Sequence, residues 1–137
     1  MSSELRFDVL VLGGGGAALR AALSACEQGA KTAILSKGEA GKSGATYYSV
    51  AEVGAFNVPD GALDPEDSPE EFYRDMEMAA LGTAQLPLCR ILAEQAESAL
   101  QYLEKISGGT VFAKEDGHFK VYQACFSTRP RSHVVEN

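Results

Sequence analysis

The sequence has few of the side chains that build metal centres and disulfide frameworks. It contains three cysteines, two histidines and no tryptophan in 137 residues. Cys26, Cys89 and Cys125 are far apart and form no CxxC pair, and only His118 and His133 are available to join them. This spacing predicts neither a zinc site nor a set of disulfides. We expect three reduced thiols in or near the core of a cytoplasmic protein.

Positive charge is also scarce. The chain has 12 basic residues against 19 acidic ones, which gives a net charge of -7. A surface of this sign repels phosphate backbones, so we do not expect nucleic acid as a partner. The apolar segment Phe7–Leu12 is too short for a signal peptide or a membrane span. We therefore expect a soluble, cytoplasmic protein whose residues 1–137 form one domain with one core.

The first third of the chain alternates strand and helix signals. Val9–Leu12 is a continuous apolar run that ends in glycines, which is typical of a buried parallel strand. An alanine-rich segment begins at Ala17 and ends at Gly29, so it predicts a helix with a glycine cap. Lys31–Leu35 is a second short apolar segment. Together they predict a βαβ unit, and hence an α/β fold with a parallel sheet.

The other predicted elements are recognised from the residues at their ends. Residues 38–67 lack periodicity and predict a long irregular region that wraps a ligand. Ser68, Pro69 and Glu71 predict a helix start with a capping box, and this helix should run to about Ala80.

A longer helix is expected from Leu86 to Ile106. Its predicted core-facing stripe, at spacings of three and four, consists of Leu88, Ile91, Leu92, Ala96, Ala99, Leu100 and Leu103. Residues 110–113 and 118–122 then predict a hairpin around the turn that contains Gly117.

One short motif carries chemistry. The segment that follows the first strand matches GxGxxA, and its residues are Gly13, Gly14, Gly15, Gly16, Ala17 and Ala18. In such a turn the first glycine permits the tight bend, the second leaves room for a pyrophosphate, and the small third residue lets the helix lie close to the strand. Unpaired amides at the helix start attract the phosphate charge. The motif predicts dinucleotide binding; the alternative is a glycine-rich turn without a ligand.

The residues after the second strand argue against a simple NAD dehydrogenase. Many dinucleotide-binding folds place an acidic residue there to bind the ribose hydroxyls. This sequence has Ser36 and Lys37 instead. Serine still hydrogen-bonds a ribose, but the usual NAD signature is missing.

At this point the sequence resembles a known family. Ile34–Lys37 and Lys42–Thr46 are similar to the conserved segments of the succinate dehydrogenase, fumarate reductase and L-aspartate oxidase flavoproteins. The resemblance implies the N-terminal part of a Rossmann-like FAD-binding domain, with helices flanking a parallel sheet, which is incomplete without a cap domain. It also implies that Ser36 and Lys37 lie at the adenosine ribose. The residues that would follow the pyrophosphate toward the isoalloxazine are Ser43, Gly44, Ala45 and Thr46.

The departures from this family have consequences of their own. Gly44 stands where many members have a histidine that bonds covalently to the flavin, so we expect noncovalent FAD. The family's A-x-G-G segment is replaced at residues 49–55, and paired glycines are missing from residues 124–131. Arg129, Arg131 and His133 form a basic cluster that either contacts a dicarboxylate or the flavin, or belongs to a solvated tail.

The resemblance implies a flavin-dependent oxidoreductase that transfers hydride between flavin and a small dicarboxylate or amino-dicarboxylate. The cap domain and the later part of the FAD domain do not fit into 137 residues, so a longer flavoprotein or a second polypeptide would supply them. We expect the chain alone to be inactive. The alternative is a non-catalytic regulatory or assembly subunit that binds a dinucleotide.

Overall fold

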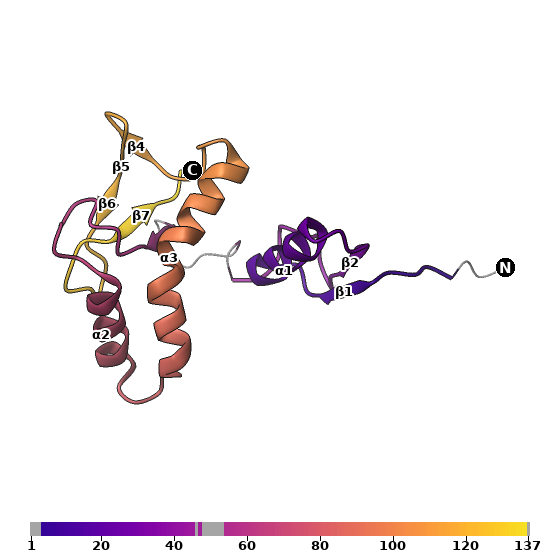
Figure 1. Ribbon diagram of the computed structural model, residues 1–137, viewed down its shortest axis with the longest axis horizontal. Helices are drawn as coiled ribbons and strands as arrows, with labels where there is room; N and C mark the ends of the chain where they lie inside the picture. Colours follow the sequence, from indigo (N-terminus) through magenta and orange to yellow (C-terminus); the bar gives the residue numbers. More distant parts are fainter. Residues whose placement is uncertain (1–3, 46, 48–53, 137) are drawn as a thin grey trace. The chain divides into compact units, whose positions relative to one another are not determined.

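The computed structural model describes residues 4–45, 47 and 54–136. The chain divides into two compact units, residues 1–52 (unit 1) and residues 53–137 (unit 2). Figure 1 shows their helices and strands, and each unit is described by itself. That both units belong to one domain remains a prediction.

Unit 1 is the predicted βαβ unit. Strand β1 (Val9–Leu12) leads into helix α1 (Gly16–Glu27), which leads into strand β2 (Thr32–Leu35). The two strands are parallel, in a register that runs from Val9 opposite Thr32 to Leu12 opposite Leu35. Parallel neighbouring strands need a crossover connection. Here α1 is that connection, and it packs against both strands. The predicted parallel sheet is confirmed, and α1 ends just before Gly29, which has a φ of 83°.

One face of this two-stranded sheet is uncovered. Along β1, half-buried Val9 and Val11 alternate with Leu10 and Leu12, which are 59% and 71% exposed. Leu35 of β2, the register partner of Leu12, is 63% exposed. Parallel sheets in folded proteins are normally covered on both faces. The described part of unit 1 therefore covers only one face, the one on which α1 packs.

Unit 2 contains two long helices that lie side by side in Figure 1. Helix α2 (Pro69–Ala80) begins as predicted, because the hydroxyl of Ser68 accepts a hydrogen bond from the amide of Glu71 at 3.2 Å. The carboxylate of Glu71 pairs with Arg74 at 2.9 Å. Helix α3 (Leu86–Ser107) ends at Gly108, whose φ is 68°. The predicted bounds of both helices are confirmed to within one residue.

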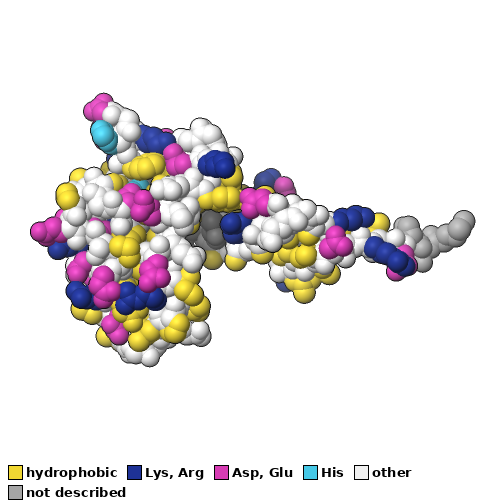
Figure 2. Space-filling model, viewed as in Figure 1, with side chains coloured by type: hydrophobic (Ala, Val, Ile, Leu, Met, Phe, Trp, Pro, Cys, Tyr) yellow, Lys and Arg dark blue, Asp and Glu magenta, His cyan; other side chains and the backbone are white. Residues whose placement is uncertain are grey.

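The predicted buried stripe of α3 is partly wrong. Ala96 and Leu100 are buried as expected, together with Ala93, which the pattern did not include. The first members of the stripe are exposed: Leu88 is 58%, Ile91 48% and Leu92 54% exposed. The apolar face of α3 is wider than the area that neighbouring elements cover. The spacing of apolar residues alone does not tell which part of this face is buried. Figure 2 shows hydrophobic side chains on the surface where α2 ends and α3 begins.

The strands of unit 2 form two small antiparallel sheets. Strand β7 (Ser132–Val134) lies between β3 (Ala55–Asn57) and β6 (Val121–Tyr122). Strands β4 (Lys114–Glu115) and β5 (His118–Phe119) form a hairpin. The core beside these sheets contains Val58, Ala96, Leu100 and Phe112.

Two strand predictions need correction. The predicted turn at Asp116 and Gly117 is confirmed, and both residues have a positive φ, of 50° and 81°. However, Phe112 pairs with Val135 rather than with the second arm of the hairpin. The region 38–67 is also not wholly irregular, because it contains β3. This three-residue strand is too short to show a pattern of its own, and its partner β7 lies about 75 residues further along the chain.

Candidate functional site

The glycine turn of unit 1 connects β1 to α1 in a conformation that only glycine adopts readily. Gly13 has a φ of 123°, which places it outside the regions open to residues with a side chain. Its amide donates to the carbonyl of Leu35 at 2.9 Å, so the turn is joined to the end of β2. A Cβ built on Gly13 would lie 3.6 Å from the Cβ of Ala18. The helix thus packs closely on the turn, as the motif predicts.

The N-terminus of α1 has no side-chain cap. The first amides of any helix have no partner within it, and the N-cap residue Gly15 has no side chain to supply one. The first turn contains no acidic residue. Gly16 and Ala17 are exposed. The positive end of the helix dipole is therefore accessible to an anion.

The hydroxyls of two serines lie close to the buried Gly14. A Cβ built on Gly14 would lie 2.5 Å from Oγ of Ser36 and 2.9 Å from Oγ of Ser43. The structure thus places two predicted site residues near the same glycine, Ser36, the residue just after β2, and Ser43 from the loop that follows. Lys37 follows Ser36 and is exposed.

The segment from Glu39 to Ala45 lies on the glycine turn. The amide of Gly41 donates to the carbonyl of Gly14 at 3.2 Å. Gly44 has a φ of 85°, and a Cβ built on it would lie 3.1 Å from Cα of Gly15. Any larger residue at this position would strain the backbone and push against the turn. Ala45 is exposed, and the predicted site residue Thr46 lies outside the described residues.

A comparison with known protein families shows which family the chain matches. The family described as "FAD binding domain" matches residues 8–134. The chain belongs to the FAD-binding domain family. FAD is the cofactor of this family, so the resemblance seen in the sequence is confirmed.

The chain is also similar to individual proteins. It is 40% identical over 118 residues to a protein of Methanothermobacter marburgensis, one of the subunits of fumarate reductase (CoM/CoB), and the match covers 85% of this chain and 20% of that protein. Two solved structures of Mycobacterium smegmatis Sdh1 also match. The complex with UQ1 has a TM-score of 0.79 at 26% identity and covers 91% of this chain and 20% of the other. The apo form has a TM-score of 0.82 at 25% identity, with 94% and 21% covered.

The chain spans about a fifth of the length of these relatives. It therefore corresponds to a part of the succinate dehydrogenase and fumarate reductase flavoproteins, as the sequence predicts.

The groups at the glycine turn are chemically compatible with FAD. Backbone amides that have no partner within the helix and a positive helix end suit a diphosphate, and no first-turn carboxylate opposes it. Gly15 leaves space beside the turn, because a Cβ there would come no closer than 3.5 Å to any protein atom. Ser36 and Ser43 supply hydroxyls of the kind that bind ribose or phosphate oxygens. In a bound state FAD supplies the redox chemistry, and these residues hold it in place.

The basic cluster in this FAD-binding chain is not a solvated tail, so that alternative is wrong. Arg131 is 1% and His133 0% exposed. Arg131 donates from Nε and Nη2 to Asp67, at 3.0 Å and 2.7 Å, and from Nη1 to Asp75 at 2.5 Å. Arg129 pairs with two further carboxylates, those of Asp64 and Glu66, at 2.7 Å and 3.0 Å. The sequence shows these acids as an ordinary acidic segment, because nothing local marks their distant partners.

The cysteines differ from expectation in their placement. All three are free, but Cys26 and Cys125 are exposed and only Cys89 is half-buried. The prediction that they lie in or near the core is therefore wrong for two of them. The described residues contain no group of three or more side chains that would hold a metal ion. None of the helices in the described part of the chain is long and apolar enough to cross a membrane.

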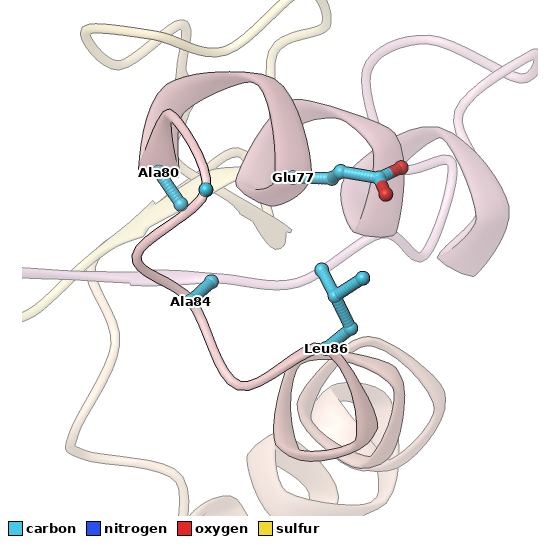
Figure 3. A pocket seen from close by; sticks show the side chains of 5 residues that line it. Glu77, Ala80, Ala84 and Leu86 are labelled. Carbon is cyan, nitrogen blue, oxygen red and sulfur yellow. The ribbon is translucent and has the colours of Figure 1, made fainter.

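Unit 2 contains two small hollows that sequence reasoning missed. The first, of about 110 Å³, lies where α2 turns into α3. Figure 3 shows Glu77, Ala80, Ala84 and Leu86 around it. The second, of about 150 Å³, is lined by residues that include Phe126 and Arg131. Pockets for whole organic ligands usually have volumes of about 300–1,000 Å³, so neither hollow has room for a dinucleotide.

Proposed function

We propose that unit 1 holds the ADP half of FAD. The pyrophosphate lies at the turn from Gly13 to Ala18, and Ser36 and Lys37 bind the adenosine ribose. Residues 43–46 continue along the pyrophosphate toward the isoalloxazine. The observation that carries this proposal is that the hydroxyls of Ser36 and Ser43 both lie close to Gly14, beside a helix start without acidic residues. The family match supports it.

We further propose that the flavin is bound without a covalent bond. Gly44 stands where many relatives have the histidine that forms this bond. Its φ of 85° and the 3.1 Å approach of a Cβ to Gly15 support glycine as the residue that fits here. The chain then retains FAD only through hydrogen bonds, electrostatics and contacts, so retention depends on folding.

The reaction we propose is hydride transfer between the flavin and a small dicarboxylate or amino-dicarboxylate. This proposal is supported by the names of the relatives, which are Sdh1 and part of a fumarate reductase. FAD is the redox group, and the residues of this chain orient its ADP half.

A further polypeptide segment is needed for that reaction. We propose that a longer chain or a second polypeptide completes the FAD-binding domain and adds the cap domain. The match covers only 20% of the fumarate reductase subunit, and the exposed face of Leu10, Leu12 and Leu35 supports a missing cover. The expected cytoplasmic location stays a prediction.

A second candidate function is a non-catalytic subunit that binds a dinucleotide. It is favoured by the burial of Arg131 and His133 and by their pairing with carboxylates of this chain, which leaves them poorly placed to bind a substrate from solvent. Flavin absorbance together with turnover separates the two candidates, because the second predicts bound flavin but no activity with any completing chain.

The decisive test of flavin binding is the variant Gly15→Val. The backbone φ at Gly15 is -85°, which any residue adopts, and a Cβ placed there would make an ordinary contact at 3.5 Å. A valine there fills the space proposed for the pyrophosphate, and FAD affinity should fall at least 100-fold, about 3 kcal/mol. The matched control is Ala21→Val, on the exposed side of α1. Unchanged affinity in folded Gly15→Val protein would refute the proposed site.

A further inference from the structure

After β2 ends, the chain comes back to the glycine turn in the serine loop, residues 39–45. The loop is closed on itself, because the amide of Lys42 donates to the carbonyl of Glu39 at 3.1 Å and the two side chains form an ion pair at 2.9 Å. Its amide at Gly41 donates to the carbonyl of Gly14 at 3.2 Å. The loop therefore has bonds of its own and one bond to the turn.

The closest approach of this loop to the turn is between two glycines. Gly44 has a φ of 85°, and a Cβ built on it would lie 3.1 Å from Cα of Gly15. From the other side, a Cβ built on Gly15 would lie 3.6 Å from Cα of Gly44 and 3.5 Å from the carbonyl oxygen of Ser43. Backbone thus packs on backbone. The main chain does not rotate aside as the end of a side chain does, so a side chain at Gly44 pushes the loop off the turn.

The same packing places the hydroxyl of Ser43, the residue before Gly44. Its Oγ lies 2.9 Å from the position that a Cβ on Gly14 would take. The loop that rests on Gly15 through its backbone therefore brings a hydroxyl to the turn. A group on a loop that is already ordered costs less entropy to bind than one on a loop that the ligand has to order.

We infer that Gly44 is a positioning residue, whose packing on Gly15 seats the serine loop against the glycine turn before any ligand binds. This inference rests on the proposed FAD site. Gly44 has no side chain to offer the ligand, so it acts through Ser43, whose hydroxyl is held ready for a pyrophosphate oxygen. The serine loop is then a fixed wall of the site rather than a flap that closes over the flavin.

Hydrogen exchange in the ligand-free 137-residue chain tests the seating. The readout is the amide of Gly41, and the variant is Gly44→Ala. The matched control is Gly29→Ala: Gly29 follows α1 with a φ of 83°, and a Cβ there meets no atom of the described residues within 4 Å. Both variants strain the backbone, but only the first disturbs the contact. Exchange at Gly41 should be at least tenfold faster in Gly44→Ala than in Gly29→Ala. Equal exchange in the two variants, or an unprotected Gly41 amide in the unmodified chain, would overturn the inference.

Flavin titration tests the role of Ser43. FAD should bind at least tenfold more weakly to Gly44→Ala than to Gly29→Ala. In a Ser43→Ala background, Gly44→Ala should weaken binding by less than about threefold, because the group that it positions is gone. An undiminished effect would show that Gly44 does not act through Ser43.

The variant Gly15→Val separates this inference from the proposed function. Unchanged FAD affinity in folded Gly15→Val protein means that the proposed site itself is wrong. If Gly15→Val abolishes binding while Gly44→Ala binds FAD as tightly as Gly29→Ala, the site stands and only the role of Gly44 is overturned.

Discussion

Asp75 of α2 and Arg131, the residue just before β7, form an ion pair in which both side chains are almost fully buried. Nη1 of Arg131 lies 2.5 Å from Oδ2 of Asp75, and the side chains are 0% and 5% exposed. The same carboxylate oxygen accepts from the amide and the hydroxyl of Thr128, at 2.9 Å and 3.0 Å. One acidic residue thus joins a helix, a loop and a strand.

Removing this carboxylate should destabilise unit 2 strongly. In Asp75→Ala, a buried guanidinium loses one of its two counter-charges and Thr128 loses its acceptor. Breaking a buried pair by deleting one partner costs about 3–5 kcal/mol. The free energy of unfolding, from urea denaturation followed by circular dichroism, measures the change. Asp64→Ala is the matched control, because its pair with Arg129 is more exposed and its loss should have a much smaller effect.

Acid should unfold unit 2 by protonating carboxylates that the fold pairs, those of Asp75 and Asp60. For Asp75, burial acts to raise the pKa, but the hydrogen bonds from Thr128 and Arg131 outweigh it and hold the pKa below its ordinary value. For Asp60, burial likewise acts to raise the pKa, and the hydrogen bond from His133 is the largest of the contributions that together lower it. A lowered pKa in the folded state gives stability that is present above the ordinary value of about 4 and is lost as the pH falls through the lowered value.

Urea midpoints measured between neutral pH and pH 2 check this expectation. Stability should fall steeply below about pH 4. Asp75→Asn should start from a lower stability and show a shallower decline, because one of the responsible carboxylates is gone. An equally steep decline in that variant would mean that other groups control the acid transition.

The elements of this chain follow from its sequence, whereas the buried charges do not. Ser68 and Gly108 mark helix ends by local chemistry, a side-chain cap and a positive φ, so their positions are predictable from a few residues. The turn at Gly13 is predictable for the same reason. The pairing of Arg131 with Asp67 joins residues 64 positions apart, and no local pattern distinguishes Asp67 from the exposed acids around it. The exposure of Leu88 likewise depends on what covers α3.

Any flavin that copurifies with this chain should be released when the protein is denatured. Gly44 has no side chain to form a bond with the isoalloxazine. After precipitation with acid, the yellow colour should remain in the supernatant, and the polypeptide band on a denaturing gel should not fluoresce. Fluorescence in that band would show a covalent attachment and would contradict the proposal.

The 137-residue chain reconstituted with FAD should not oxidise succinate or aspartate, nor reduce fumarate. Catalysis requires the reacting carbon to be held about 3–3.5 Å from flavin N5 in a site closed to water. Arg131 and His133, which the sequence offered as substrate contacts, are buried and paired with carboxylates. Steady-state assays with an artificial electron carrier measure this. Turnover of a few per second by the chain alone would show that it builds a substrate site of its own.

The position of β7 has a consequence for the order in which the protein folds during synthesis. This strand is near the end of the described chain, yet it is the middle strand of its sheet, contains His133 and directly follows Arg131. The contacts within unit 1 join residues that are close in the sequence. Unit 1 can therefore fold early, soon after β2 leaves the ribosome. Unit 2 must wait until residue 134 has emerged. Until then Asp60, Asp67 and Asp75 lack their partners, and the nascent segment around α2 is acidic, solvated and open to proteases.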